Sequence, residues 1–313
     1  MKSVSIRVPA TSANLGPGFD CLGLALDLWN ETVILWQEPP GRYPFTATIY
    51  VEGEGSGFLP GDDRNWIVRA ALYLMKKAGA APPGKVEIRC KNGILLSSGL
   101  GSSAAAVLTG LMAANAWLEK PLGQAAILKL ATELEGHPDN VAAAIFGGLA
   151  LVAPGSPGEP PLVQTVPIPV WSVVVALPGI NLSTQAARAS LPEMVPLKTA
   201  VANIGRSMLV VEALRNGDET LLGKAMQDRL HQPYRLPRIP GAEEAILAAR
   251  QAGAAAAALS GAGPGVIAFL PPNEPSIAEH VLKAMEASFH DAGVQARGFQ
   301  LRTTSQGASI EQK

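Results

Sequence analysis

The stretch SSGLGSSAAAV, residues 97–107, places four serines and two glycines directly before a run of small apolar residues. Glycine permits positive φ angles and a close approach of a ligand to the backbone. A helix N-terminus adds unpaired N–H groups and a partial positive charge, which together favour an anion. The pattern predicts either a phosphate-binding loop before a buried helix at 102–118, or a serine-capped helix after a tight glycine turn. No lysine follows the last glycine, so the loop is not a Walker A motif.

The composition narrows the class of protein. The chain has 313 residues, of which 48% are apolar and 16% charged, and its net charge is −1. A near-neutral total gives no support for the basic face that nucleic-acid binding requires. The two cysteines, Cys21 and Cys90, belong to no paired motif, and we expect them to be free thiols.

No export or membrane segment is expected. The N-terminus lacks the apolar core of a signal peptide. The apolar run at 104–118 is short for a bilayer, and the run at 251–270 is interrupted by glycines and a proline. We therefore expect a soluble, cytoplasmic protein without nucleic-acid or membrane partners.

Strand-like and helix-like patterns alternate without a regular βα repeat, which favours an α+β fold. The Gly/Pro-rich segment at 153–161 is the best candidate for a domain boundary. We expect an N-terminal domain at 1–153, a C-terminal domain at 162–303 and a disordered tail at 304–313.

Local patterns also predict individual elements. Residues 9–23 are expected to form a loop. Strands are expected at 4–8, 24–36, 86–90, 149–153, 171–178 and 298–302, and helices at 66–78, 102–118, 123–135, 198–215, 218–230, 241–252 and 276–291.

Three glycine-rich segments, in order along the chain, resemble the motifs of one family, the GHMP kinases. They are PATSANLGPGFDCLG at 9–23, GLGSSAA at 99–105 and LSGAGPGVIAFL at 259–270. The resemblance implies a ribosomal-protein-like N-terminal βαβ domain, a ferredoxin-like C-terminal domain and an active site in the cleft between them. It also implies ATP and Mg²⁺ as cofactors. The residues that would bind ATP are Leu95, Leu96, Ser97, Ser98, Gly99, Leu100, Gly101, Ser102, Ser103, Ala104 and Ala105.

Three further segments narrow the resemblance within the family. EGHPDNVAAAIFGG (135–148), STQAARASLP (183–192) and DRLHQPYR (228–235) resemble members that phosphorylate the side-chain hydroxyl of L-homoserine to O-phospho-L-homoserine, a step toward threonine. The chain departs from the family at Ala143, where proline is frequent, and before the loop, where a proline often stands. Both departures affect loop stiffness more than chemistry.

Two alternatives stay open at this point. One is a GHMP kinase for a sugar or an isoprenoid alcohol of the mevalonate type, and the other is a non-catalytic binding protein of the same fold. A homodimer is a further expectation from the resemblance alone.

Charges in the two halves of the chain suit a zwitterionic substrate. Asp20 is suited to an ammonium group, with Asn14 beside it, although Asn and Asp also favour turns. Arg188 and Arg235 are expected to bind a carboxylate, because a planar guanidinium forms paired hydrogen bonds with it. Thr184 would add a hydroxyl contact near Arg188.

The segment GHPDN, residues 136–140, contains the residues expected to bind the substrate and to orient its reacting hydroxyl. The resemblance assigns His137 and Asn140 to the bound amino acid, and Asn140 is expected to orient the reacting hydroxyl. Asp139 is the alternative as a base, although it also fits a plain helix cap. Since phosphoryl transfer depends mainly on positioning and charge neutralisation, a strong base is not obligatory.

Magnesium requires hard oxygen ligands and keeps waters and phosphates as its other ligands. The resemblance places a ligating glutamate within TELEG, 132–136. The match to TELEG favours Glu133 as that ligand, with Glu135 as the alternative. Because residues two apart on a helix face different directions, only one of the two is expected to point inward. Ser103, slightly ahead of Ser102, is expected as the second ligand.

Overall fold

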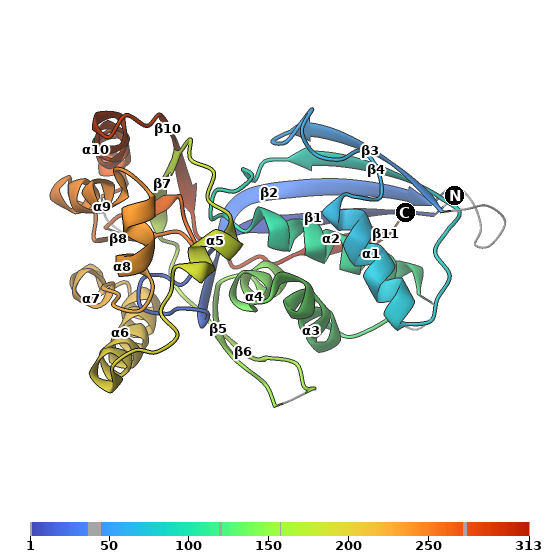
Figure 1. Cartoon of the computed structure of the whole chain (residues 1–313), viewed down its shortest axis with the longest axis horizontal. Helices are drawn as coiled ribbons and strands as arrows, with labels where there is room; N and C mark the ends of the chain where they lie inside the picture. The colour runs from blue at the N-terminus through green and yellow to red at the C-terminus, as the bar shows by residue number, and fades with distance from the viewer. Residues whose placement is uncertain (1, 37–44, 119–120, 157, 272–273, 313) are drawn as a thin grey trace.

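The computed structural model describes residues 2–36, 45–118, 121–156, 158–271 and 274–312. The chain forms two halves that lie side by side (Figure 1). The N-terminal half contains a long sheet with helices on one face, and the C-terminal half contains a smaller sheet with its own helices. The predicted α+β class is confirmed.

The N-terminal sheet has the strand order β11-β1-β2-β4-β3, and β5 and β6 join it at β2. Strands β3 and β4 are parallel and are connected by α1 (Trp66–Lys77), which forms the predicted βαβ unit. The other strand pairs in this sheet are antiparallel. The strands are β1 (Lys2–Ala13), β2 (Leu22–Trp36), β3 (Thr46–Gly53), β4 (Lys85–Asn92), β5 (Leu149–Ala153), β6 (Leu162–Val166) and β11 (Ser309–Gln312).

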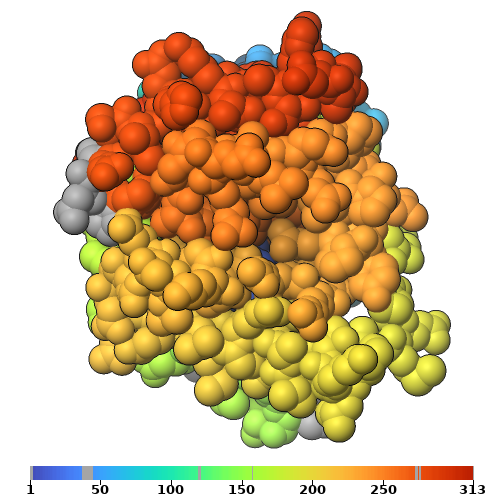
Figure 2. Space-filling view, turned by 90° about the vertical axis from the view of Figure 1, so that its left-hand side faces the viewer, coloured from blue at the N-terminus to red at the C-terminus, as the bar shows by residue number. Residues whose placement is uncertain are grey.

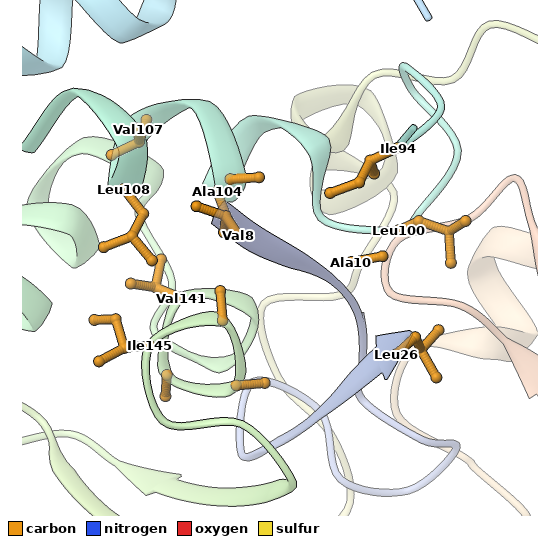
Figure 3. Packing of buried hydrophobic residues seen from close by; sticks show 14 of the residues in the cluster. Val8, Ala10, Leu26, Ile94, Leu100, Ala104, Val107, Leu108, Val141 and Ile145 are labelled. Carbon is orange, nitrogen blue, oxygen red and sulfur yellow. The ribbon is translucent and has the colours of Figure 1, made fainter. Parts of the chain in front are cut away.

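Helix α2 (Ser102–Trp117) is the centre of the N-terminal core, as its all-round apolar sequence predicts. It packs against β1 of the sheet, against α1, and against helices α3 (Gln124–Glu135) and α4 (Asp139–Phe146). Its glycine Gly110 lies directly against the carbonyl of Ile67, so α1 and α2 pack closely. Figure 3 shows the buried side chains that join α2, β1 and α4: Ala104, Val107, Leu108, Val8, Ala10, Val141 and Ile145.

The C-terminal half contains a four-stranded antiparallel sheet of order β10-β7-β9-β8. Its strands are β7 (Ser172–Pro178), β8 (Ala256–Leu259), β9 (Val266–Phe269) and β10 (Ala296–Arg302). Its helices are α5 (Thr184–Ala189), α6 (Leu197–Asn216), α7 (Glu219–Ala225), α8 (Gln232–Arg235), α9 (Ala242–Gln251) and α10 (Ala278–Asp291). No helix in the described ranges has the length and apolar character to cross a membrane.

The predicted loop at 9–23 begins too early. β1 continues to Ala13, and its register with β2 shifts between Pro9 and Ala10. A proline is tolerated in a strand at such an irregularity, so β1 continues through Pro9.

The predicted helix over 218–230 is also too long, since α7 ends at Ala225. The carboxylate of Asp228 then accepts hydrogen bonds from the backbone N–H groups of Leu230, His231 and Gln232 at 2.9, 2.9 and 2.6 Å. A short aspartate side chain that competes in this way for backbone donors starts a new turn, here that of α8.

The tail at 304–313 is not disordered over its described residues. Ser309–Gln312 form β11, which pairs antiparallel with β1 at the other end of the chain. Before it, the N–H of Ala308 donates to the carbonyl of Ala144 at 2.7 Å. These partners lie far away in sequence, so local composition gives no signal for them.

The N-terminal domain extends beyond its expected limit at residue 153. β6 lies beyond the predicted boundary at 153–161 but pairs with β5, so the N-terminal sheet extends to Val166. The same sheet takes back β11 after the C-terminal half is complete. The N-terminal half is therefore built from residues both before and after the C-terminal half, so one boundary does not separate the two.

Candidate active site

A pocket of about 790 Å³, including its open mouth, lies where the two halves meet. Elements from both contribute to its wall. The described residues that line it are Ala13, Asn14, Asp20, Ser97, Ser98, Gly99, Gly101, Ser102, Ser103, Ala104, Glu135, His137, Asp139, Asn140, Leu182, Ser183, Thr184, Arg188, Arg235, Gly261, Ala262 and Gly263. The pocket thus brings together most of the residues that the sequence predicts.

The glycine-serine loop forms one end of the pocket with its backbone. Gly99 and Gly101 have φ angles of 77° and 72°, in the left-handed region where glycine is favoured. A side chain at Gly101 would meet the hydroxyl of Thr11, and one at Gly99 would meet the carbonyl of Ser260. Gly101 immediately precedes α2, so the N-terminus of that helix opens onto the pocket.

The loop is held by the two other glycine-rich motifs. The backbone N–H of Thr11 donates to the carbonyl of Leu100 at 3.1 Å. The hydroxyl of Ser260 donates to the carbonyl of Gly99 at 2.7 Å. Three motifs that are far apart in sequence are therefore joined by hydrogen bonds into one loop cluster, and local sequence patterns do not predict these roles of Thr11 and Ser260.

The predicted ATP-binding residues fall into three groups. Ser97–Ala104, except Leu100, line the pocket. Leu95, Leu100 and Ala105 are buried in the core and support the loop from behind. Leu96 is partly exposed and lines a neighbouring pocket that also contains Ser97 and Ser98.

The two candidate metal-binding glutamates are clearly separated. Glu135 lines the pocket, and the hydroxyl of Ser103 donates to its carboxylate at 2.7 Å. Glu133 points away, where the hydroxyl of Tyr73 donates to it at 2.5 Å and Lys77 lies at 3.6 Å. The preference for Glu133 is therefore corrected: the structure places Glu135, not Glu133, beside Ser103.

Burial raises the pKa of Glu135, and the hydrogen bond from Ser103 partly offsets that effect. A carboxylate held in this way gains from a nearby cation. In the described residues no group of three His, Cys, Asp or Glu side chains is placed to hold a metal alone.

The GHPDN segment forms a hydrogen-bonded chain at the start of α4. Nδ1 of His137 lies 2.7 Å from Oδ1 of Asp139, and the same oxygen accepts the backbone N–H of Asn140 at 2.7 Å. The hydroxyl of Thr11 donates to Oδ1 of Asn140 at 2.8 Å. Both side chains at 139 and 140 are thereby oriented before any substrate enters.

The pKa of His137 is raised. Burial acts to lower it, but the hydrogen bond and charge of Asp139, together with the charges of Glu135 and Asp20, outweigh burial. His137 and Asp139 therefore form an ion pair when the imidazole is protonated. This pair favours a single ring orientation in the pocket wall.

Asp20 and Arg188 are paired with each other across the two halves. The guanidinium donates two hydrogen bonds of 2.8 Å to the two carboxylate oxygens. Asp20 has a positive φ of 55°, and its N–H donates to the side chain of Asn14 at 3.0 Å. Nδ2 of Asn14 in turn donates to the carbonyl of Gly261 at 2.8 Å, which ties the first motif to the third.

Arg235 differs from Arg188 because it is buried and forms no ion pair with any carboxylate in the part of the chain described. Its guanidinium contacts the carbonyl of Gly261 at 3.3 Å and Nδ1 of His231 at 3.2 Å. Burial, with repulsion from Arg188, lowers the pKa of Arg235 to about 10. A buried cation without a counter-ion facing a pocket is suited to an anionic ligand group.

Asp228, for which the sequence pattern predicts no role in the site, holds Arg235 in place indirectly. Its buried carboxylate organises the start of α8 and accepts a hydrogen bond from Nδ2 of Asn203 at 2.6 Å. Nε2 of His231 lies 3.5 Å from Asp228 and 2.8 Å from the carbonyl of Gly16. The helix predicted over 218–230 includes Asp228, and the available signal for its actual role is an aspartate four residues before a helix start that contains proline.

A phosphate-type loop that faces a magnesium-suited carboxylate and a charged pocket defines a phosphotransferase that acts on a small molecule. Comparison with known proteins identifies the family. The sequence profile of the GHMP kinases N terminal domain matches residues 65–148, and that of the GHMP kinases C terminal domain matches residues 210–291. The chain belongs to the GHMP kinase family.

Individual relatives agree with this assignment. The chain is 45% identical to the homoserine kinase of Moorella thermoacetica over 97% of its own length and 99% of the relative's. It is 40% identical to the homoserine kinase of Synechococcus sp. (strain CC9605), covering 98% of this chain and 95% of the relative. The crystal structure of homoserine kinase from Cytophaga hutchinsonii superposes with a TM-score of 0.83 at 30% identity, covering 99% and 97% of the two chains.

Proposed function

We propose that this chain transfers the terminal phosphoryl group of ATP to the side-chain hydroxyl of L-homoserine, forming O-phospho-L-homoserine. The observation that carries the proposal is the buried, unpaired guanidinium of Arg235 in a pocket that also contains Asp20 and a phosphate-type loop. An amino acid with a hydroxyl side chain has a carboxylate, an ammonium and an acceptor oxygen to match these three features. The names of the relatives support the same substrate.

Substrate binding would proceed by an exchange of partners. In the free protein, Asp20 and Arg188 neutralise each other. A zwitterion that enters between them offers its ammonium to Asp20 and its carboxylate to Arg188 and Arg235. One ion pair is thereby replaced by two, which reduces the cost of breaking the original pair.

ATP and Mg²⁺ would occupy the opposite end of the pocket. The backbone N–H groups of the loop and the N-terminus of α2 bind phosphate oxygens, and Glu135 with Ser103 supplies hard oxygen ligands for the metal. When bound, Mg²⁺ neutralises charge on the phosphates. The neighbouring pocket that shares Ser97 and Ser98 has apolar walls from Phe58, Leu177 and Ile180, which suit the nucleotide base.

Asn140 would orient the reacting hydroxyl, because Thr11 fixes its side chain in the pocket wall. The proton then leaves toward water or phosphate, or toward Asp139 if that residue acts as a base. These two routes differ in their dependence on pH. Asp139→Asn removes an acidic limb from the pH profile of kcat only if Asp139 accepts the proton, whereas Asn140→Ala lowers kcat without changing the profile.

A panel of acceptors tests the proposal. ADP release is measured with L-homoserine, with 3-aminopropanol, which lacks the carboxylate, and with 4-hydroxybutyrate, which lacks the ammonium; mevalonate and galactose serve for the other branches of the family. We expect phosphorylation of L-homoserine and a loss of at least about 30-fold in kcat/KM for each truncated analogue. Equal use of 3-aminopropanol would contradict carboxylate recognition, and no ADP release with any acceptor would favour a non-catalytic binding protein.

The expected cytoplasmic location and homodimer stay predictions. Equilibrium sedimentation and fractionation of cells that express the native chain would test them.

A further inference from the structure

The loop that joins β1 to β2, residues 14–21, extends from the N-terminal half into the C-terminal half (Figure 1). Residues 14–18 are buried, and yellow to orange segments of the C-terminal half form most of the face seen in Figure 2. The carbonyl of Pro17 accepts hydrogen bonds from the side chains of Asn203 and Ser207 on α6, at 3.2 and 2.7 Å. This loop is therefore anchored to the C-terminal half.

Phe19, near the end of this loop, lies against three side chains of the C-terminal half. The guanidinium carbon of Arg188 is 5.4 Å from the centre of the Phe19 ring, and that of Arg235 is 5.2 Å from it. The His231 ring stacks on Phe19, with the two centroids 5.4 Å apart and the planes at 29°. Phe19 is half-buried and is not one of the described residues that line the pocket. It therefore acts on the two arginines and not directly on a ligand.

The groups that accept hydrogen bonds from the Arg235 guanidinium are neutral. Nε and Nη1 donate to the carbonyls of Ala187 and Gly261 at 3.5 and 3.3 Å, and Nη1 lies 3.2 Å from Nδ1 of His231. Nε2 of His231 lies 2.8 Å from the carbonyl of Gly16. Because a carbonyl only accepts and a guanidinium only donates, His231 carries its proton on Nε2 and accepts from Arg235 through Nδ1. The imidazole is therefore neutral, and burial accordingly lowers the pKa of His231.

An aromatic ring can hold a guanidinium without neutralising it. A carboxylate beside Arg235 would occupy its N–H donors and repel a second carboxylate that arrives with a ligand. The face of an aromatic ring attracts a cation within about 6 Å of its centre, and it leaves the N–H groups at the edge of the guanidinium free. Within the described residues no hydrogen bond uses Nη2 of Arg235. Phe19 thus offsets part of the repulsion that Arg188 exerts on Arg235 and keeps that donor available.

We propose that Phe19 is a positioning residue for the substrate carboxylate: its ring keeps Arg188 and Arg235 side by side while Arg188 separates from Asp20. This rests on the proposed function, because the carboxylate is that of the amino-acid substrate. Arg188, whose side chain is 41% exposed, is held by its two hydrogen bonds to Asp20 and by the Phe19 ring. Only the hydrogen bonds must break when the substrate ammonium takes Asp20. The aromatic contact stays and prevents the guanidinium from turning into solvent.

Steady-state kinetics with two acceptors test this role. Phe19→Leu should raise KM for L-homoserine by roughly 5- to 30-fold and leave kcat within about 2-fold, since only binding of the carboxylate is weakened. KM for 3-aminopropanol, which has no carboxylate, should hardly change. Phe19→Tyr keeps the aromatic face and should restore most of the loss. Phe146→Leu is the matched control and should leave both KM values unchanged: Phe146 is also half-buried, and no arginine of the described residues lies over its ring.

Fluorinated phenylalanines placed at position 19 alone separate the charge effect from packing. Fluorine withdraws electron density from the ring face with little change in ring shape, so the attraction for a cation weakens stepwise. KM for L-homoserine should rise in the order phenylalanine, 4-fluorophenylalanine, 3,4,5-trifluorophenylalanine. Near-ultraviolet circular dichroism verifies that each protein is folded. A role in packing alone would leave KM constant along the series.

The unmodified chain is measured first, so that two kinds of failure are distinguished. If it releases no ADP, or uses 3-aminopropanol as well as L-homoserine, the proposed function fails together with the role of Phe19. If it prefers L-homoserine but KM stays constant in Phe19→Leu and along the fluorinated series, only the role of Phe19 is overturned. An equal rise in KM for both acceptors also overturns it, because that result would show a general loss of packing.

Discussion

The two ends of the pocket differ in the groups that line them: mainly backbone at one end and charged side chains at the other. The end proposed for phosphate is formed largely by backbone: two glycines in the left-handed region, a helix N-terminus, and carbonyls held by Thr11 and Ser260. The substrate end consists of charged side chains, Asp20 from one half and Arg188 and Arg235 from the other. A backbone site suits a ligand that all members of a family share, whereas a side-chain site can change with each substrate.

The two ends also differ in whether existing contacts must break before a ligand binds. At the end proposed for phosphate, hydrogen bonds from Thr11 and Ser260 hold the loop carbonyls in place. At the substrate end, the ion pair between Asp20 and Arg188 must separate before both side chains can bind a substrate. Arg235 is buried and has no counter-ion among the described residues. Substitutions at the two ends should therefore affect ATP and homoserine separately.

The largest effect is expected from Gly101→Val. A side chain at this position meets Thr11 and occupies the space where phosphate oxygens would approach, and the φ of 72° is unfavourable for valine. ATP binding, measured by calorimetry, should fall below detection. Gly123→Ala is the control, because a Cβ there meets open space at a φ of −73°. Unchanged ATP affinity in Gly101→Val, with the fold intact, would remove the loop from the nucleotide site.

The second effect concerns the other end of the pocket. Arg235→Leu should lower kcat/KM for homoserine by roughly 30-fold to several thousand-fold, since truncation of one partner of a buried charge pair costs about 2–5 kcal/mol. ATP affinity should hardly change. Arg235→Lys should recover only part of the loss, because an ammonium cannot make the paired contact.

Exposed Arg238 provides the matched control, and Arg238→Leu should leave homoserine kinetics unaltered. Thermal unfolding of all three variants separates lost binding from lost stability. If Arg235→Leu weakens ATP and homoserine equally, the two ends of the pocket are not independent.

Glu135, the proposed metal ligand, lies beside Ser103 of the loop, and its substitution should show a smaller effect. Glu135→Gln should raise the Mg²⁺ concentration required for half-maximal activity by roughly 10-fold or more. Glu133→Gln should have little influence on it, because that side chain is engaged with Tyr73 outside the pocket. The reverse ranking in a magnesium titration would restore Glu133 as the ligand.

The smallest effect concerns pH and the pair of His137 and Asp139. Because the folded protein raises the pKa of His137 above its usual 6.5, the protonated pair stabilises the fold fully below that value and loses its effect as the pH rises through the folded-state pKa. His137→Gln should therefore lower the free energy of unfolding by more at about pH 5.5 than at about pH 9. Urea unfolding at both values measures the difference, and an equal loss at both would show that the ion pair is not the stabilising contact.

The sequence alone predicted the features that depend on local backbone chemistry. The glycine-serine loop, the buried helix behind it and the α+β class follow from residue spacing and from the conformations that glycine permits. The resemblance of three motifs then indicated the residues around the pocket, and most of them do line it.

Only the tertiary structure decided the features that depend on distant partners. The choice between Glu133 and Glu135 depends on which side of α3 faces Ser103, and two positions on one helix turn cannot reveal this. The final strand β11 depends on a free edge of β1 at the opposite end of the chain. Charge pairing follows the same rule: Asp20 and Arg188 are 168 residues apart, and a sequence specifies their charges but not that they meet. Local conformation is set by neighbouring residues, whereas burial, pairing and pKa depend on what the whole fold brings close together.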